Sequence, residues 1–587
     1  MKRTLLLALL FALMAAACQP AAVNPPPTVD DPGPILQPAA IPEPTPMEQP
    51  PVVLTICTAS LPETRFPYAS PATPAKSRLV DLLYPPAYTL ENLRLEAVPI
   101  RRGQMVIDAR GQLVMAAEGI WGRPASCRES ACALTWNGLD PLAMDQMVMD
   151  YRLRPGLTWG DGTPLSATDA VFGFHLVSGP FSAAFGWAEA HTESFDAVDT
   201  SRLTGRGYPG FASSQPEQFY WLPLPAHRFA DAADAVTLAA DPFWREDGSG
   251  YGPFKFAGQE DALLRLERNP AYPYPDDAYP GVDQVVLRRI AGGAPAAWEA
   301  LQNGTCDALD ASFNLAEDPA LLNAIAAEAG YTVLRTPGGA PTQLVFGIRP
   351  AEYDTLNNPV FARRKDFFAD PRTRQALALC VDVENLAAQT GAAPARPDGL
   401  AYDPAAGRAL LEEVGWADHD GDPLTPRQAL NVTGVFNATP LALTLLVGPS
   451  PFHQDLAAGI AEGLQACGVG VDLETLPTDE LYAPGPEGPV FGRNFDLALI
   501  AWQPAPGPLC ALYTSWAVPN TGNGWVGTNV AGFADAEFDA LCSAALLAIP
   551  EEAPARQLAV DAAFLEWLPA LPLVEPVDVE VWRGDSW

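Results

Sequence analysis

The chain has 587 residues, of which 48% are apolar and 18% charged, which is the composition of a globular protein rather than a disordered one. Its net charge is −35 at pH 7, and a field of that sign repels phosphate, so we do not expect a nucleic acid as a partner. The length is sufficient for several domains with a large buried core.

Residues 1–17 have the pattern of an export signal. A basic start precedes the run from Thr4 to Met14, which is almost wholly apolar and would span only roughly 17 Å as a helix, against a hydrocarbon core of about 30 Å. We therefore expect a signal peptide rather than a membrane span. Three alanines then precede Cys18, which resembles the bacterial lipobox, with Ala15 where Leu is usual. This pattern predicts lipidation at Cys18; the alternative is ordinary signal cleavage, with this cysteine incidental.

Residues 18–51 form a proline-rich tether. Twelve prolines, four acids and no basic residue occur between Gln19 and Pro51, a composition that cannot build a packed core and that favours polyproline II. Fully extended, the segment would reach about 100 Å. We expect it to hold a folded body away from a membrane, which places the protein outside the cytoplasm, in the periplasmic space or at the outer cell surface.

The folded body begins with short strands. Val52–Ile56 is prone to form a β-strand, and the segment "QMVIDARGQLV" (104–114) has the pattern of a hairpin. Residues 147–154 continue as a strand. A change follows near residue 291, where helical patterns become longer and alternate with strands, which is typical of an α/β fold. The expected helices are 295–302, 318–329, 372–388 and 455–466.

A strand, a turn and a capped helix follow one another from Tyr151 to Leu176. Tyr151 and Leu153 fall on one face of the strand, and Asp161 begins a turn with the glycine that follows it. Ser166 and Asp169 have the spacing of a helix N-cap and its third helical residue. We therefore expect both aspartates to build structure rather than to act as a catalytic pair.

One later strand ends at a candidate binding rim. Residues 495–502, "FDLALIAW", are apolar nearly throughout, as suits a strand buried on both faces of a sheet. Ligands of open α/β sheets bind beyond the carboxyl ends of strands, so 502–507 is a candidate rim. The alternative is a rigid Pro/Gly loop whose Trp packs on the core.

The cysteines predict disulfides, because exported proteins meet an oxidising compartment. If Cys18 is lipidated, eight of the nine cysteines remain. We expect three bridges between the following pairs: Cys127 and Cys132, Cys306 and Cys380, Cys510 and Cys542. Cys57 and Cys467 are left over, and free buried thiols compete with a fourth bridge for those two.

Several motifs in order along the chain resemble one family. They are "YRLRPGLTWGDGTPLSATDAVFGF", "GYGPFKF", "LERNPAY", "VDQVVLRRI", "ALQNGTCDAL", "RTRQALALCVDVENLA" and "YDPAAGRALLEEVGW". This set resembles the family 5 extracellular solute-binding proteins, the dipeptide-, oligopeptide- and nickel-binding receptors of ABC importers. The resemblance implies an α/β, two-lobed periplasmic-binding-protein type II fold with mixed β-sheets. It places lobe I at 52–290 with 570–587, and lobe II at 291–569.

The same resemblance implies a receptor rather than an enzyme. A small solute or peptide would bind in a cleft between the lobes and be delivered to an ABC permease and its ATPase, and we expect a monomer. The sequence contains no complete Gly-x-Ser-x-Gly elbow and no His-Glu-x-x-His motif, so we expect no catalytic residue. The alternative is a surface lipoprotein that uses this fold for adhesion, chaperoning or signalling.

The resemblance also suggests contact residues. In peptide binders of this family an Asp just after the Trp of the buried strand pairs with the α-amino group of the ligand, whereas here Trp502 is followed by Gln503-Pro504-Ala505. A buried amine without a partner is costly, so we do not expect an ordinary free-amino peptide. We expect ligand contacts from Trp502, Gln503 and Phe346. The five histidines have no close metal spacing, and we expect neither a metal nor a cofactor.

Overall fold

The computed structural model describes residues 50–584, except 70–72, 129, 178–187, 230–234, 247–249, 340, 356–364, 423 and 503–507. The expected signal peptide, Cys18 and all but the end of the proline-rich tether lie outside the described residues. By its contacts the chain divides into 1–50 and 51–587, and the fold below is that of the second unit. In the part of the chain that the structure describes, no helix is both long and apolar enough to cross a membrane.

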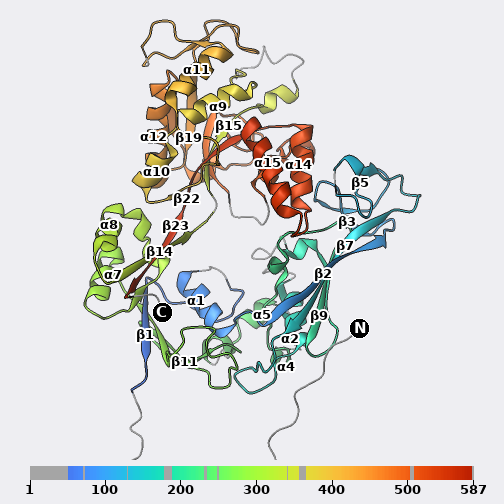
Figure 1. The fold of residues 1–587 in the computed structure, drawn as a ribbon, viewed down its shortest axis with the longest axis vertical. Helices are drawn as coiled ribbons and strands as arrows, with labels where there is room; N and C mark the ends of the chain where they lie inside the picture. Colours follow the sequence, from blue (N-terminus) through green and yellow to red (C-terminus); the bar gives the residue numbers. More distant parts are fainter. Residues whose placement is uncertain are drawn as a thin grey trace, which may run out of the picture. The chain divides into compact units, whose positions relative to one another are not determined.

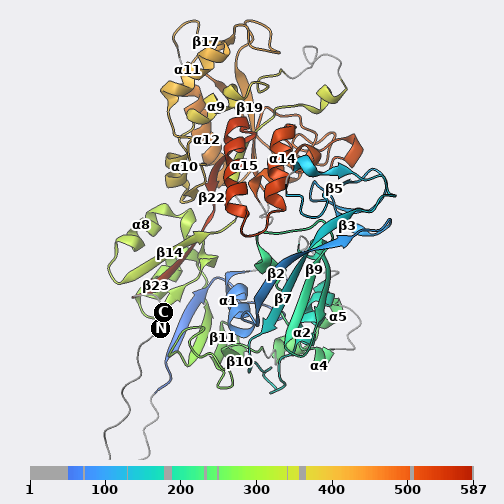
Figure 2. The ribbon, with the colours of Figure 1, turned by 45° about the vertical axis from the view of Figure 1, so that its right-hand side comes forward.

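Residues 51–587 contain two large mixed sheets, each with a hydrophobic core of its own. We call the first lobe the body built on the sheet that contains β1, and the second lobe the body built on the sheet that contains β21 (Figures 1 and 2). The fold class is therefore the two-lobed, mixed α/β arrangement expected from the sequence.

The main first-lobe sheet brings together segments that are far apart in the chain. In spatial order its seven strands are β10 (Phe254–Glu260), β11 (Leu263–Arg268), β12 (Gln284–Arg289), β1 (Val53–Thr58), β13 (Ala308–Leu309), β23 (Val577–Arg583) and β14 (Tyr331–Pro337). β1 runs parallel to both of its neighbours, and Leu54 and Ile56 on β1 are fully buried. The helices that accompany this sheet are α1 (Pro74–Leu83), α7 (Gly293–Gln302) and α8 (Pro319–Ala327).

A second first-lobe sheet contains the segment from Tyr151 onwards. Its four strands are β2 (Tyr88–Pro99), β7 (Ala143–Leu153), β9 (Arg202–Gly207) and β8 (Thr192–Ala197), with α2 (Ala167–Val177) beside them. Asp169 accepts a hydrogen bond from the Ser166 backbone N–H at 2.8 Å, and Asp161 accepts one from the Thr163 N–H at 2.9 Å. The two aspartates are a helix cap and a turn former, as the sequence predicted.

Small hairpins and short helices complete the first lobe. The hairpin β3 (Met105–Ile107) and β4 (Leu113–Met115) is the one predicted at 104–114. The other short elements are β5 (Trp121–Gly122), β6 (Leu134–Thr135), α4 (Ala226–Phe229), α5 (Ala235–Ala239) and α6 (Phe243–Glu246).

The second-lobe sheet has β21 in its interior. In order its strands are β16 (Ala393–Pro394), β22 (Ala570–Glu575), β15 (Thr342–Phe346), β21 (Leu497–Ala501), β19 (Ala442–Val447) and β20 (Gly470–Thr475). The residues 497–500 of β21 are at most 2% exposed, which confirms the prediction of a strand buried on both faces. β19 and β20 are parallel and are joined by α12 (Pro451–Ala466), as the sequence also predicted.

Helices pack around this sheet, and one prediction about them is wrong. The helix expected over 372–388 is two helices, α9 (Pro371–Leu379) and α10 (Val383–Thr390), because the Asp382 side chain caps a new start by accepting from the Asn385 N–H. The other elements of this lobe are α11 (Pro404–Val414), β17 (Trp416–Ala417), β18 (Gln428–Ala429), α13 (Thr478–Leu481), α14 (Ala536–Leu546) and α15 (Ala553–Trp567).

The chain passes between the two main sheets at two adjacent places. β14 ends at Pro337 in the first-lobe sheet and β15 begins at Thr342 in the second-lobe sheet, while β22 leads into β23 at Pro576. The passages run side by side, since the Gly338 backbone N–H donates to the Pro576 carbonyl oxygen at 2.7 Å. The sequence placed the boundary between the lobes at residue 290. In the structure β13 and β14, which follow that residue, both belong to the main first-lobe sheet.

Four disulfides join all eight cysteines that the structure describes. Two of them, Cys127–Cys132 and Cys510–Cys542, are pairs suggested by the sequence. The expected bridge between Cys306 and Cys380 is wrong. Because β1 and β13 are neighbouring strands, Cys306 pairs with Cys57, while Cys380 at the end of α9 pairs with Cys467 at the end of α12.

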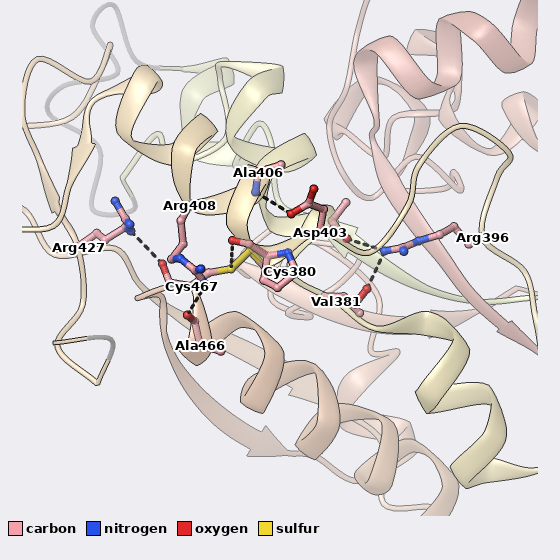
Figure 3. The surroundings of a disulfide bond; sticks show 11 residues. Cys380, Val381, Arg396, Asp403, Ala406, Arg408, Arg427, Ala466 and Cys467 are labelled. Atoms are coloured by element: carbon pink, nitrogen blue, oxygen red, sulfur yellow. Dashed lines mark hydrogen bonds between the residues drawn. A yellow bond between two sulfur atoms is a disulfide. The ribbon is translucent and has the colours of Figure 1, made fainter. Parts of the chain in front are cut away.

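Guanidinium groups surround the Cys380–Cys467 bridge and cap the helices that end there (Figure 3). Arg427 Nε donates to the Cys467 carbonyl oxygen at 2.9 Å, and Arg396 donates to the Val381 carbonyl oxygen at 2.7 Å. Cations at helix carboxyl ends satisfy free carbonyl groups and oppose the negative end of the helix dipole. This part of the second lobe is therefore fixed both covalently and by charge.

Candidate functional site

The carboxyl end of β21 is the candidate rim, and Trp502 begins it. The Trp502 side chain is half-buried, with its ring centroid 6.3 Å from that of Phe491 in an edge contact. Its indole Nε1 is buried and forms no hydrogen bond of ordinary geometry. Gln503, which the sequence suggested as a contact, lies outside the described residues.

β15 places a buried amide beside this strand end. β15 and β21 are antiparallel, with Thr342 opposite Ala501 and Gln343 opposite Ile500. Gln343 is 0% exposed, and its Oε1 accepts a hydrogen bond from the Tyr513 hydroxyl. Among the described residues, its Nε2 has no hydrogen-bond partner. An amide with one satisfied and one unsatisfied end is uncommon inside a protein, because the N–H groups lose their water on burial.

Tyr513 connects these two groups. Burial raises its pKa well above the ordinary tyrosine value, and the neighbouring Trp502 indole opposes that rise by a smaller amount. Asn529, which is also fully buried, donates to the Tyr513 carbonyl oxygen at 2.9 Å, and the ring of Phe564 contacts the tyrosine edge-on. The tyrosine is therefore held on several sides and remains a neutral phenol at physiological pH.

Tyr482 adds a further hydroxyl at the same strand end. Burial raises its pKa, while a hydrogen bond to the Ala501 backbone lowers it by less. Glutamine, tryptophan and tyrosine side chains are all neutral near pH 7. The arrangement can therefore donate hydrogen bonds to a bound oxygen atom, but these side chains offer no charge to an ion.

Phe346, the remaining contact suggested by the sequence, is not at the rim. It is 0% exposed and packs in the second-lobe core, 5.6 Å from Phe368 between ring centroids. Successive side chains of a strand point to opposite faces, so Phe346 and Gln343 lie on different faces of β15. Sequence analysis missed Gln343 and Tyr513; the signal for the former was an amide near the start of a strand whose next three residues are apolar.

A separate hollow of about 330 Å³ lies next to the two chain passages. Its walls come from both lobes, with Asn314 and Asp578 from the first and Thr390, Ser450 and Phe452 from the second. Small-solute sites commonly have volumes of this order and lie between domains. Among the described residues, no group of three or more His, Cys, Asp or Glu side chains is placed to hold a metal ion.

Comparison with known proteins relates the chain to one family. The model of "Bacterial extracellular solute-binding proteins, family 5 Middle" matches residues 142–524, which is more than half of the chain. A protein of Brucella ovis whose name describes an ABC transporter peptide-binding protein is 24% identical over 304 residues, covering 48% of this chain and 52% of that protein. The chain thus spans about half the length of the curated relatives that it matches.

Solved structures share the fold. HbpA2 of Haemophilus parasuis has a TM-score of 0.62 at 16% identity, over 90% of this chain and 95% of that one. An ABC transporter substrate-binding protein of Sinorhizobium meliloti has a TM-score of 0.60 at 18% identity, over 90% and 95% of the two chains. On the family model and this fold together, the chain belongs to the bacterial extracellular solute-binding proteins of family 5.

Proposed function

We propose that the protein is the solute receptor of an ABC importer, which captures a peptide-like or other small solute between its lobes and delivers it to a membrane permease and its ATPase. The observation that carries this proposal is the pair of adjacent passages between the lobes, one between Pro337 and Thr342 and the other at Pro576. Capture and release need no covalent step, so the proposal includes no enzymatic activity.

The paired passages have the properties of a hinge. Each lobe has a hydrophobic core of its own, so a rotation between the lobes breaks neither core. The passages are hydrogen-bonded to each other through Gly338 and Pro576, so that they would bend as one ribbon. We therefore place the division of the lobes at these passages, with residues 51–337 and 577–584 in the first lobe and 342–575 in the second.

The nature of the solute is supported by the relatives and by the rim. The Brucella ovis relative is named for peptide binding, which favours a peptide-like solute. The rim at Trp502 offers neutral hydrogen-bond donors, which suit the carbonyl groups of such a molecule. Trp502 remains our proposed ligand contact, and Gln343 joins it as a candidate.

We also propose that Cys18 is lipidated and anchors the receptor as a monomer at the cell membrane, with residues 19–51 as the tether. Labelling with a radioactive fatty acid should mark the wild-type protein and leave Cys18→Ser unmarked. If the substituted protein is labelled equally, or if mature wild-type protein leaves the membrane in high salt without detergent, the anchor is wrong.

A direct binding experiment tests the receptor function. Protein purified from its native host should carry a small molecule that mass spectrometry of the denatured sample identifies. Adding that molecule back to stripped protein should raise the melting temperature, because a ligand that binds only the folded state stabilises it. It should also reduce the radius of gyration in small-angle X-ray scattering. A ligand that raises the melting temperature without compaction would contradict closure, and the absence of a stabilising ligand across peptides, opines, sugars and chelates would contradict the receptor.

A further inference from the structure

Gln343 presents a donor whose direction is fixed. The Tyr513 hydroxyl donates a hydrogen bond to Gln343 Oε1. The opposite end is the NH₂ group, and in the part of the chain that the structure describes it has no partner, although the side chain is 0% exposed. The Tyr513 ring is 0% exposed and packs edge-on against Phe564, with 5.7 Å between ring centroids, which restricts its rotation.

Trp502 supplies a second donor at the same edge of the sheet. Thr342 on β15 lies opposite Ala501 on β21. Gln343 follows Thr342 in the chain and Trp502 follows Ala501, so the two side chains start from neighbouring strands at the same strand end. The indole Nε1 is buried without a hydrogen bond of ordinary geometry, and both side chains interact with Tyr513. Among the described residues the Gln343 NH₂ group thus lacks an acceptor, and beside it the Trp502 N–H has only Tyr513 nearby, without ordinary hydrogen-bond geometry.

The chemistry of these donors restricts what they accept. N–H groups attract an oxygen lone pair and repel an ammonium group, whose hydrogens also point outward. Gln343, Trp502 and Tyr513 are neutral, so they offset little of the free energy that is lost when a charged carboxylate is buried. An uncharged carbonyl group can be buried at little cost if it receives hydrogen bonds.

The geometry points to Gln343 and Trp502 as the side chains that select a neutral carbonyl oxygen of the solute, such as an acyl or peptide carbonyl, in preference to a free ammonium group. This inference rests on the proposed receptor function and specifies one part of its ligand. It assigns Tyr513 the role of a positioning residue, which fixes the direction of the Gln343 amide without touching the solute.

Two matched peptides test the selection. The probes are Ala-Phe-Ala-amide and its N-acetylated form, which differ only in carrying an ammonium group or an acyl carbonyl, and calorimetry measures each affinity. The wild-type protein should bind the acetylated peptide at least tenfold more tightly. Gln343→Leu should weaken binding of the acetylated peptide about tenfold and leave the free-amine peptide unchanged, and Trp502→Phe, which retains the ring, should weaken it several-fold. Gln343→Glu should reverse the preference, because it replaces a donor by an anionic acceptor.

Controls separate this inference from the receptor function. Gln465→Leu makes the same substitution at an exposed position of α12 and should alter neither affinity. Each variant must keep a cooperative thermal transition. For Gln343→Glu the affinity for the free-amine peptide should rise, and a loss of folding cannot produce such an increase. If the wild type binds the acetylated peptide but Gln343→Leu binds it equally well, the selection is wrong while the receptor stands. If the wild type binds neither peptide, the peptide-receptor function fails and the selection fails with it.

Discussion

The guanidinium of Arg128 in the first lobe lies 3.4 Å from the carboxylate of Glu552, which directly precedes α15 in the second lobe. The same arginine lies 3.1 Å from Asp145, and the Ser543 hydroxyl on α14 donates to the Ala109 carbonyl oxygen. Figure 2 shows α14 and α15 beside the strands around β5. The lobes therefore meet at a second place, away from the paired passages.

Removing the charge of Glu552 should favour separation of the lobes. Both side chains of the Arg128–Glu552 pair are about a quarter exposed, at 24% and 27%, so we expect Glu552→Gln to change the free energy of unfolding by less than about 1 kcal/mol. The radius of gyration of the ligand-free protein should nevertheless increase, and X-ray scattering measures it. Glu267→Gln is the control, because its partner Lys255 lies on the adjacent strand of the same sheet. Equal radii for the two variants would count against the contact as a closing element.

The disulfides should differ strongly in their effect on stability. The Cys57–Cys306 bridge spans 249 residues and the Cys127–Cys132 bridge only five. In the chain-entropy model these correspond to about 5 and about 2 kcal/mol. Urea unfolding of the double alanine variant at 57 and 306 should therefore show a much larger loss than the double variant at 127 and 132, which is the matched control. Equal losses would show that the bridges act through local packing instead.

Lys76 should make stability increase at alkaline pH. Its amine is 5% exposed and donates to the Thr64 and Phe66 carbonyl oxygens; burial and the nearby Arg65 lower its pKa from 10.5 to about 8. Below pH 8 both the folded and unfolded states carry this proton. Between about pH 8 and 10.5 the folded state has released it while the unfolded state still binds it, so the free energy of unfolding rises with pH, by about 2–3 kcal/mol.

The measurement is urea unfolding of wild type and Lys76→Met from pH 7 to 10.5. As the pH rises, the free energy of unfolding of the wild type should increase relative to that of Lys76→Met. Lys255→Met, at an exposed lysine, should leave the slope unchanged. A slope that is identical in wild type and Lys76→Met would show that other groups produce the rise.

Asn529 should be among the most sensitive polar positions. Its Nδ2 donates to the carbonyl oxygens of Tyr513, Thr514 and Phe533, and the residue is 0% exposed. Asn529→Ala would remove these hydrogen bonds from a buried site, although the Thr514 oxygen would keep its bond from the Ala517 N–H, and should cost about 2–4 kcal/mol in the free energy of unfolding. Asn92→Ala, at an exposed asparagine with one long bond, should cost less than about 0.5 kcal/mol. Comparable losses would remove the argument that Asn529 holds Tyr513 in place.

Local signals in the sequence were sufficient for several elements. The cap at Ser166 and Asp169 and the apolar run of β21 each rest on residues close together in the chain, so their patterns were readable. The β19–α12–β20 unit was readable for the same reason. Ordered motifs then identified the family, and with it the fold.

The errors concern relationships that only the folded chain creates. Cys57 and Cys306 are 249 residues apart, and their pairing follows from the parallel alignment of β1 with β13. β13 has two residues, too few to show a strand period, so nothing in the sequence indicated that the main first-lobe sheet continues beyond residue 290. Phe346 was suggested as a ligand contact, but all residues of β15 are buried, so the sequence pattern of this strand could not show which side chain lies near the rim.

The position of β23 has a consequence for biosynthesis. This strand lies between β13 and β14, inside the main first-lobe sheet, yet it consists of residues 577–583. A nascent chain therefore cannot close the sheet that its residues 53–58 begin until residue 583 has left the ribosome. Contacts of such long sequence separation form slowly. The delay keeps this sheet incomplete for as long as the chain is being synthesised.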